Sequence, residues 1–117
     1  MMCAAAFCAT GDYSYVSDVN YRSGDDYVNE MCRLDVAYVK GAMDRPVIVW
    51  FHGGGLTEGH RHIPDHFRDR DYVIVPVEYR LYPGASVSEI LEDCAASVAW
   101  VFKNIGSSSK LHSEGPR

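Results

Sequence analysis

The chain contains 117 residues and has a formal net charge of −5, from 16 acidic and 11 basic side chains. This length allows one domain at most, and the acidic balance argues against nucleic-acid binding, which requires a basic face. No apolar run approaches the roughly 18 residues of a membrane helix, so we predict no transmembrane segment.

The cysteines are few and irregularly spaced, with no C-x-x-C motif, which argues against a disulfide framework. Cys94 falls on the apolar face of a predicted helix, so we expect it to be a small core residue. The four cysteines are Cys3, Cys8, Cys32 and Cys94.

The amino-terminal part, residues 1–30, is predicted to hold a short leader-like stretch and one edge strand. Met1 to Ala9 is apolar but short, and it has no basic n-region. A signal-peptide remnant in a secreted protein and a plain segment in a cytoplasmic one both fit, so localisation stays open. Asp18 to Arg22 reads as a short edge strand, and a turn is expected at Ser23 to Asp26.

Two further strands are expected before the middle of the chain. Cys32 to Lys40 alternates between apolar and polar residues, which indicates a half-buried strand that pairs antiparallel with the first. Val47 to Phe51 is entirely apolar and holds three β-branched residues. We predict that this run is a strand buried on both faces, as in a parallel sheet, at the centre of the core.

A glycine-rich loop ends that strand abruptly. His52 is followed by Gly53, Gly54 and Gly55. Three consecutive glycines provide no side chains for packing. Such a run is typical of a backbone that turns sharply or approaches another group closely. Successive N–H groups in such a loop can point into one space and form a concave anion-binding surface. These donors suit the oxyanion of a tetrahedral acyl-transfer intermediate.

A second buried strand is predicted at Tyr72 to Val77, after an irregular stretch in which Pro64 begins a short helix that ends at Arg70. Pro76 lacks a backbone donor, so we expect it to mark a bulge or the end of pairing.

The clearest helix of the chain follows a turn at Tyr82 to Ala85. Ser86 and Glu89 form an S-x-x-E capping box, and Gly106 is placed to close the helix. Residues 107–117 are polar and aperiodic, and we expect a disordered tail. The predicted apolar face consists of Val87, Ile90, Leu91, Cys94, Ala95, Val98, Val101, Phe102 and Ile105.

The order of these elements resembles the α/β-hydrolases, and within them the HGGG-type esterases and lipases. The resemblance rests on the strand followed by H-G-G-G, on V-P-V-E-Y-R-L at residues 75–81, and on the helix after the Pro-Gly turn. It covers roughly Arg33 to Ile105. It implies an α/β fold: two antiparallel strands, then parallel strands joined by a right-handed helical crossover. We expect residues 31–106 to form the amino-terminal part of such a domain.

The resemblance also implies a carboxylic-ester hydrolase that uses a serine nucleophile, an acid and a histidine. Gly54 and Gly55 would supply oxyanion-hole N–H groups, and His52 would support the loop. No G-x-S-x-G motif occurs in the 117 residues, so we expect a chain that stops before the nucleophile elbow and is inactive alone. Ser107 to Ser109 lack the strand-turn-helix context of a nucleophile. A non-catalytic fragment or small-molecule binding module is the alternative.

No cofactor is expected, and an ester substrate is the implied partner. A zinc site is the competing interpretation of the histidine-rich stretch, but its spacing departs by one residue from the H-x-H-x-D-H signature of metallo-β-lactamase-like hydrolases, so no metal is predicted. That stretch contains His60, His62, Asp65 and His66.

Three structural expectations complete the prediction. Arg80 is expected to pair with Glu92 or Asp93 of the final helix, and Glu78 is expected at the surface or in a hydrogen bond and not as a catalytic acid. An exposed sheet edge is expected to favour self-association.

Overall fold

The computed structural model describes residues 13–41, 44–68 and 70–105. The expected leader-like stretch, the Gly106 cap, the polar tail and Ser107 to Ser109 lie outside these residues. The described part contains four strands, two α-helices and one short 3₁₀ turn. They are β1 (Tyr13–Asn20), α2 (Asp26–Met31), β2 (Arg33–Val39), β3 (Val47–Phe51), η1 (Asp65–Phe67), β4 (Val73–Val77) and α3 (Val87–Asn104).

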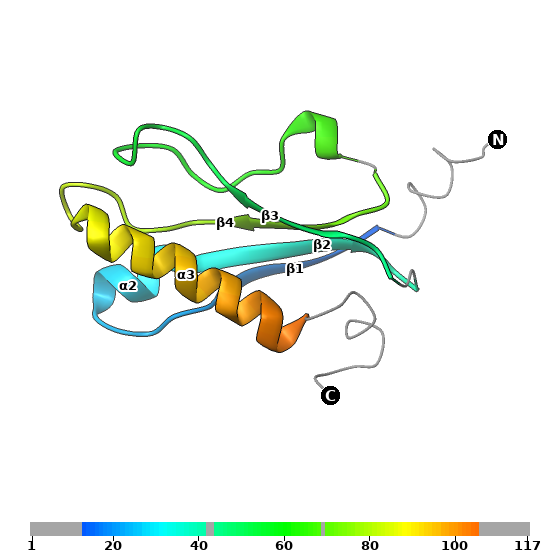
Figure 1. The fold of residues 1–117 in the computed structure, drawn as a ribbon, viewed down its shortest axis with the longest axis horizontal. Coiled ribbons are helices and arrows are strands. Elements are labelled where there is room, and N and C mark those ends of the chain that lie inside the picture. Colours follow the sequence, from blue (N-terminus) through cyan, green and yellow to red (C-terminus); the bar gives the residue numbers. More distant parts are fainter. Residues whose placement is uncertain (1–12, 42–43, 69, 106–117) are drawn as a thin grey trace.

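The strands form one mixed sheet in the order β1-β2-β4-β3 (Figure 1). β1 pairs antiparallel with β2, β2 pairs antiparallel with β4, and β3 pairs parallel with β4. The predicted architecture, two antiparallel strands followed by a parallel pair, is confirmed.

The centre of the sheet differs from the prediction. Every residue of β4 is buried, whereas every residue of β3 is half-buried. β4 has partners on both sides, and within the described residues β3 pairs with β4 alone. The expectation that Val47 to Phe51 lies at the centre, buried on both faces, is therefore wrong. Two apolar runs of equal length do not reveal which strand is inserted between the others.

The amino-terminal strand is longer than expected, and a helix follows it. β1 begins at Tyr13 because its backbone follows β2 along its length, with a register shift between Val16 and Val19. The predicted turn continues into α2, whose N-cap is Asp25. The Asp25 carboxylate accepts a hydrogen bond from the Val28 N–H at 2.9 Å, as expected of an N-cap residue.

The connection between the parallel strands contains less helix than predicted. The expected helix from Pro64 to Arg70 is limited to η1, and the rest of the connection is irregular. Pro76 marks neither a bulge nor an end of pairing. It pairs with Trp50 of β3, and the ladder continues through Val77. On the other side, Ala37 and Leu34 pair with Ile74 and Val77 without a shift.

α3 lies along one face of the sheet (Figure 1). Its predicted capping box is present: the Glu89 N–H donates to the Ser86 hydroxyl at 3.1 Å, and the Ser86 N–H donates to the Glu89 carboxylate at 2.8 Å. The apolar face is narrower than expected, because Val87, Leu91 and Phe102 are 49%, 63% and 69% exposed. The buried residues of α3 are Ile90, Asp93, Ser97 and Val101.

The main core lies between α3 and the sheet. Three residues outside the strands and helices also belong to it. Tyr21 and Cys32 flank α2, and Ile105 follows α3. A second, smaller cluster gathers around Tyr79, Ala85 and Ile90, and Cys94 packs against it as predicted. Neither helix of the described residues combines the length and apolar character that a bilayer span requires. The buried members of the main core are Tyr21, Val28, Cys32, Leu34, Val36, Val73, Val75, Val77, Val101 and Ile105.

Candidate functional site

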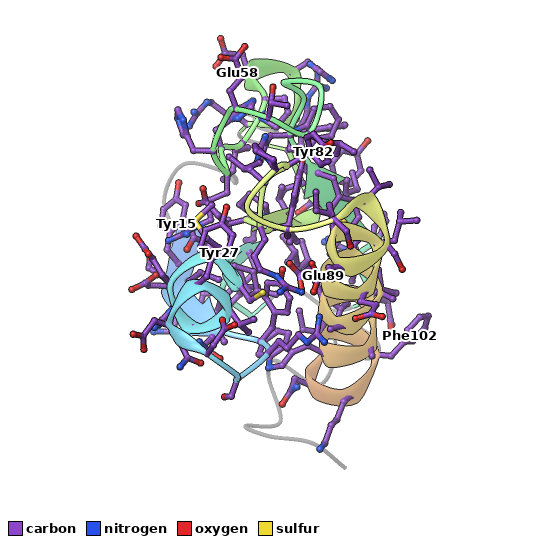
Figure 2. All side chains as sticks on the ribbon, turned by 90° about the vertical axis from the view of Figure 1, so that its left-hand side faces the viewer. Tyr15, Tyr27, Glu58, Tyr82, Glu89 and Phe102 are labelled. Carbon is purple, nitrogen blue, oxygen red and sulfur yellow. The ribbon has the colours of Figure 1, made fainter. Side chains whose placement is uncertain are left out.

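The glycine loop follows β3 at the same end of the sheet where β4 continues into Tyr79 and Arg80. β3 and β4 are parallel, so their carboxyl ends meet at this edge. Figure 2 looks at this end of the molecule, with Glu58 of the loop at the top of the view and Tyr82 of the segment after β4 below it. The two segments are joined by a hydrogen bond, in which the Tyr82 N–H donates to the Leu56 carbonyl at 2.7 Å.

The loop folds back on itself so tightly that two positions require glycine. A Cβ on Gly54 would lie 2.0 Å from the Glu58 carbonyl oxygen, and one on Gly59 would lie 2.5 Å from both the Gly53 oxygen and His52 Nδ1. Both residues also have positive φ, at 122° and 105°. Any side chain at either position would therefore strain the backbone and collide with it.

His52 begins the loop, and its buried side chain contacts the loop backbone. Its side chain is 4% exposed, and its ring stacks on the Tyr79 ring with centroids 4.4 Å apart and an interplanar angle of 7°. Nδ1 lies 2.7 Å from the Gly53 carbonyl oxygen. Since a carbonyl only accepts, Nδ1 carries the proton. Nε2 has no partner within the described residues.

Two more residues donate hydrogen bonds to carbonyls of this segment. The Tyr79 hydroxyl donates to the His52 carbonyl. The Thr57 N–H and hydroxyl both donate to the Gly54 carbonyl, at 3.1 and 3.2 Å. By contrast, Gly53, Gly54 and Gly55 are exposed, and their N–H groups have no acceptor among the described residues. Within the described part of the chain, the loop therefore contains three consecutive N–H groups without an acceptor.

Arg80 fixes the segment after β4 to α3. Its Nε and Nη2 donate to the two carboxylate oxygens of Asp93, each at 2.9 Å, and its backbone N–H donates to the same carboxylate at 3.1 Å. The predicted pairing is confirmed with Asp93, whereas Glu92 contacts Arg22 at 3.4 Å. Arg22 also binds Asp93, at 2.6 Å.

The electrostatics of Asp93 follow from these contacts. Burial alone would raise the pKa of the Asp93 carboxyl, but the hydrogen bonds from Arg80 outweigh it and hold the pKa below its ordinary value. The neighbouring Cys32 thiol is fully buried, and burial raises its pKa to about 11. Cys32 is therefore a neutral core thiol and not a nucleophile.

Glu78 takes the hydrogen-bonded role that the sequence predicts for it. Its carboxylate accepts from Arg61 at 3.0 Å. Arg61 also binds Asp35 and Asp18, each at 3.1 Å. Burial opposes the charge of Arg61, but its hydrogen bond with Asp35 raises the pKa of the guanidinium. This network joins β1, β2 and the residue after β4.

The histidine-rich stretch does not form a metal centre in the part of the chain that the structure describes. The rings of His60 and His62 lie 6.2 Å apart, and His62 Nδ1 contacts the His60 carbonyl at 3.1 Å. Asp65 binds Arg68 at 3.0 Å, and the His66 ring lies against Phe67. No three His, Cys, Asp or Glu side chains within residues 13–41, 44–68 and 70–105 converge on one point.

Sequence reasoning found the loop but missed three residues that shape it: Thr57, Gly59 and Tyr79. Gly59 ends the same glycine-rich stretch, so its spacing from Gly54 was a usable signal of a closed loop. Tyr79 belongs to the V-P-V-E-Y-R-L motif, but its contact with His52 depends on strand pairing. Thr57 offers no sequence signal.

Comparison with known proteins identifies the family. A model of the BD-FAE family matches residues 34–110, which include most of β2 and all of β3, β4 and α3. Phenmedipham hydrolase of Pseudarthrobacter oxydans is 32% identical over 74 residues, covering 54% of this chain and 15% of that protein.

Solved structures show the same fold. Esterase B from Lactobacillus rhamnosis superimposes with a TM-score of 0.66 at 22% identity, covering 78% of this chain and 30% of that one. The carboxylesterase EstE1, cloned from a metagenomic library, superimposes with a TM-score of 0.60 at 24% identity, covering 90% and 36%.

The matches extend over a small share of each relative. The chain spans 8% to 24% of the length of the curated relatives and about a third of the solved structures. Within that share, the chain has the fold of part of an esterase structure. The chain therefore belongs to the α/β-hydrolase carboxylesterase family and represents part of the length of its relatives.

Proposed function

We propose that this chain supplies the oxyanion-binding part of a serine carboxylesterase. One observation carries the proposal: Gly54 and Gly55 are exposed residues whose N–H groups have no acceptor within the described residues, while the Gly53 and Gly54 carbonyls accept hydrogen bonds from side chains. Preorganised donors of this kind stabilise an oxyanion because they need no reorganisation as charge develops.

The proposed chemistry is acyl transfer. A serine hydroxyl adds to the ester carbonyl carbon as a histidine takes its proton, and the carbonyl electrons move onto oxygen. The N–H groups of Gly54 and Gly55 donate to that oxygen. Collapse of the intermediate expels the alcohol, whose oxygen takes the proton from the histidine, and water then hydrolyses the acyl-enzyme to release the acid and restore the serine. One donor of this kind is worth about 2.7–4 kcal/mol in the transition state.

The serine, acid and histidine of this reaction are not recognisable in the 117 residues. We therefore expect the purified chain to hydrolyse p-nitrophenyl butyrate no faster than a Gly54→Pro variant. Proline removes the N–H and cannot adopt the positive φ of Gly54. Hydrolysis that Gly54→Pro abolishes would show that the chain contains a nucleophile and would overturn the division of roles proposed here.

Anion binding tests the loop directly. The chain labelled with ¹⁵N-glycine carries ten glycines, so Gly24, Gly41 and Gly84 serve as internal controls. We expect the ethyl methylphosphonate anion, a tetrahedral mimic of the intermediate, to shift the Gly54 and Gly55 amide signals saturably. Neutral dimethyl methylphosphonate should leave them in place. Equal shifts at all glycines, or no shifts, would contradict an oxyanion site.

The alternative is a non-catalytic binding module that keeps the loop as a small-molecule site. The absence of a G-x-S-x-G motif from the sequence favours it. It predicts the opposite preference in the same titration: the neutral phosphonate ester would bind as well as the anion.

A further inference from the structure

We propose that Tyr79 and Thr57 are positioning residues which, with His52, set the directions of three consecutive N–H groups in the glycine loop. This inference deepens the proposed function and rests on it for the identity of the bound anion. The residues that receive this support are Gly53, Gly54 and Gly55.

Three consecutive carbonyls each accept a hydrogen bond from a side chain. The His52 carbonyl accepts from the Tyr79 hydroxyl. The Gly53 carbonyl accepts from His52 Nδ1 at 2.7 Å. The Gly54 carbonyl accepts from the Thr57 hydroxyl at 3.2 Å and from the Thr57 N–H at 3.1 Å. Glycine-rich backbone has no side chains to fix its peptide planes, so these bonds take over that task.

Holding a carbonyl also holds the next N–H. A trans peptide is planar, and its N–H points opposite to its C=O. The donor on each carbonyl therefore determines where one N–H points: Tyr79 for Gly53, His52 for Gly54, and Thr57 for Gly55. The three glycines are exposed residues, and their N–H groups have no acceptor within the described residues. The three carbonyls are hydrogen-bonded to side chains, and the three N–H groups of the same peptides can donate to a bound anion.

The supports themselves differ in how firmly they are held. Tyr79 is 2% exposed, and the next residue, Arg80, is bound through its backbone and side chain to the fully buried Asp93. The Tyr79 hydroxyl thus reaches the loop from the core. Thr57 is exposed and belongs to the loop itself. Its hydroxyl can be removed without opening the core, which makes it the sharper test.

The first test uses no anion. In the ¹⁵N-glycine spectrum we expect Thr57→Val to move the Gly55 amide signal and Tyr79→Phe to move the Gly53 signal, with Gly54 least affected by either. Thr57→Ser should restore the wild-type spectrum, because it keeps the hydroxyl. Ser88→Ala, which removes an exposed hydroxyl from α3, is the matched control and should move none of the three. Imidazole ¹⁵N signals should show the His52 proton on Nδ1.

The second test measures affinity for the ethyl methylphosphonate anion. Thr57→Val removes the hydroxyl but keeps the N–H that also donates to the Gly54 carbonyl, so we expect a Kd about two- to threefold weaker, with Thr57→Ser close to wild type. The melting temperature of Thr57→Val should equal that of wild type. Unchanged glycine signals in both Thr57→Val and Tyr79→Phe would overturn the positioning roles. If the wild-type chain binds no anion, the proposed function fails, while the anion-free spectra still decide whether these side chains position the loop.

Discussion

Two arginines tie the same end of β4 to the rest of the protein from opposite faces of the sheet. Arg80 binds Asp93 on the face that α3 covers, and it is 7% exposed. Arg61 binds Glu78, Asp35 and Asp18 on the other face, where the connection between β3 and β4 crosses the strands. The assignment to opposite faces follows from alternation, since Leu34 and Val36 point into the core and Asp35 points away from it.

The difference between the two sites lies in desolvation. The Asp93 side chain is fully buried, so its charge depends entirely on Arg80 and Arg22. The carboxylates around Arg61 are 64%, 27% and 15% exposed, so water can replace the guanidinium there. Removing a charged partner should therefore cost more unfolding free energy at the buried Asp93 site than at the solvent-accessible Arg61 site, although Arg61 has more partners.

The largest effect is expected from Asp93→Ala. The substitution leaves the Arg80 guanidinium buried without its carboxylate, which costs about 3–5 kcal/mol of unfolding free energy. Urea denaturation measures this loss. Glu92→Ala is the matched control on the same helix: Glu92 is 59% exposed and 3.4 Å from Arg22, so it should cost under about 0.5 kcal/mol. Equal losses in the two variants would mean that burial does not distinguish these carboxylates.

The free energy of unfolding should fall at alkaline pH because of Cys32, which lies in the same buried site. Its thiol lies beside Asp93, and burial raises its pKa from 9.0 to about 11. A group with a raised folded pKa stabilises the fold below its unfolded pKa, and the contribution is lost as pH rises from 9 towards 11. We expect a decline of about 1–3 kcal/mol across this window, reduced in Cys32→Ala.

The buried Tyr21 hydroxyl, whose pKa burial also raises, adds to the same decline. Tyr21→Phe separates the two contributions in urea denaturation series at each pH. A decline that is identical in wild type and Cys32→Ala would assign the whole effect to other groups.

The smallest effect is expected from Arg61→Met, which keeps the apolar stem and removes the charge. We expect a loss of about 1–2 kcal/mol at low ionic strength, because the three carboxylates remain hydrated. Added salt should shrink this loss but leave the Asp93→Ala loss nearly unchanged. Denaturation at two salt concentrations checks both. A salt-independent loss as large as that of Asp93→Ala would break the distinction between the two faces.

Local patterns predicted the elements of this fold better than their arrangement. Five consecutive apolar residues placed β3 at its observed bounds, and the Ser86 and Glu89 pair placed the start of α3. The six-residue helix α2 was missed because it depends on the Asp25 cap and the packing of Val28, with no periodic pattern. The sequence predicted β3 at the centre, but β4 lies between β2 and β3. This order follows from long-range pairing, which the apolar residues of neither strand reveal.

The candidate site shows the same limit. H-G-G-G predicted where the glycine loop lies, and the motif after β4 predicted where Arg80 lies. The closing contacts of Gly59 and Thr57, and the stacking of Tyr79 on His52, arise only when the loop returns to the end of the sheet. Likewise, periodicity predicted Leu91 and Phe102 inside, but burial instead reaches Asp93 and Ser97. Their positions on the helix depend on where the sheet lies.

The place of β4 between β2 and β3 also constrains the order in which the protein folds. Asn20 pairs with Arg33 across a short connection, so β1 and β2 can associate early. Leu34 of β2 can pair with Val77 only after β4 has joined the sheet. Within the described residues, β3 likewise pairs only with β4. Long-range pairings of this kind slow folding, because the entropy of closing the intervening loop is lost before the favourable contacts form. Until β4 inserts, two strands expose unpaired backbone groups, so aggregation and folding compete for the same edges.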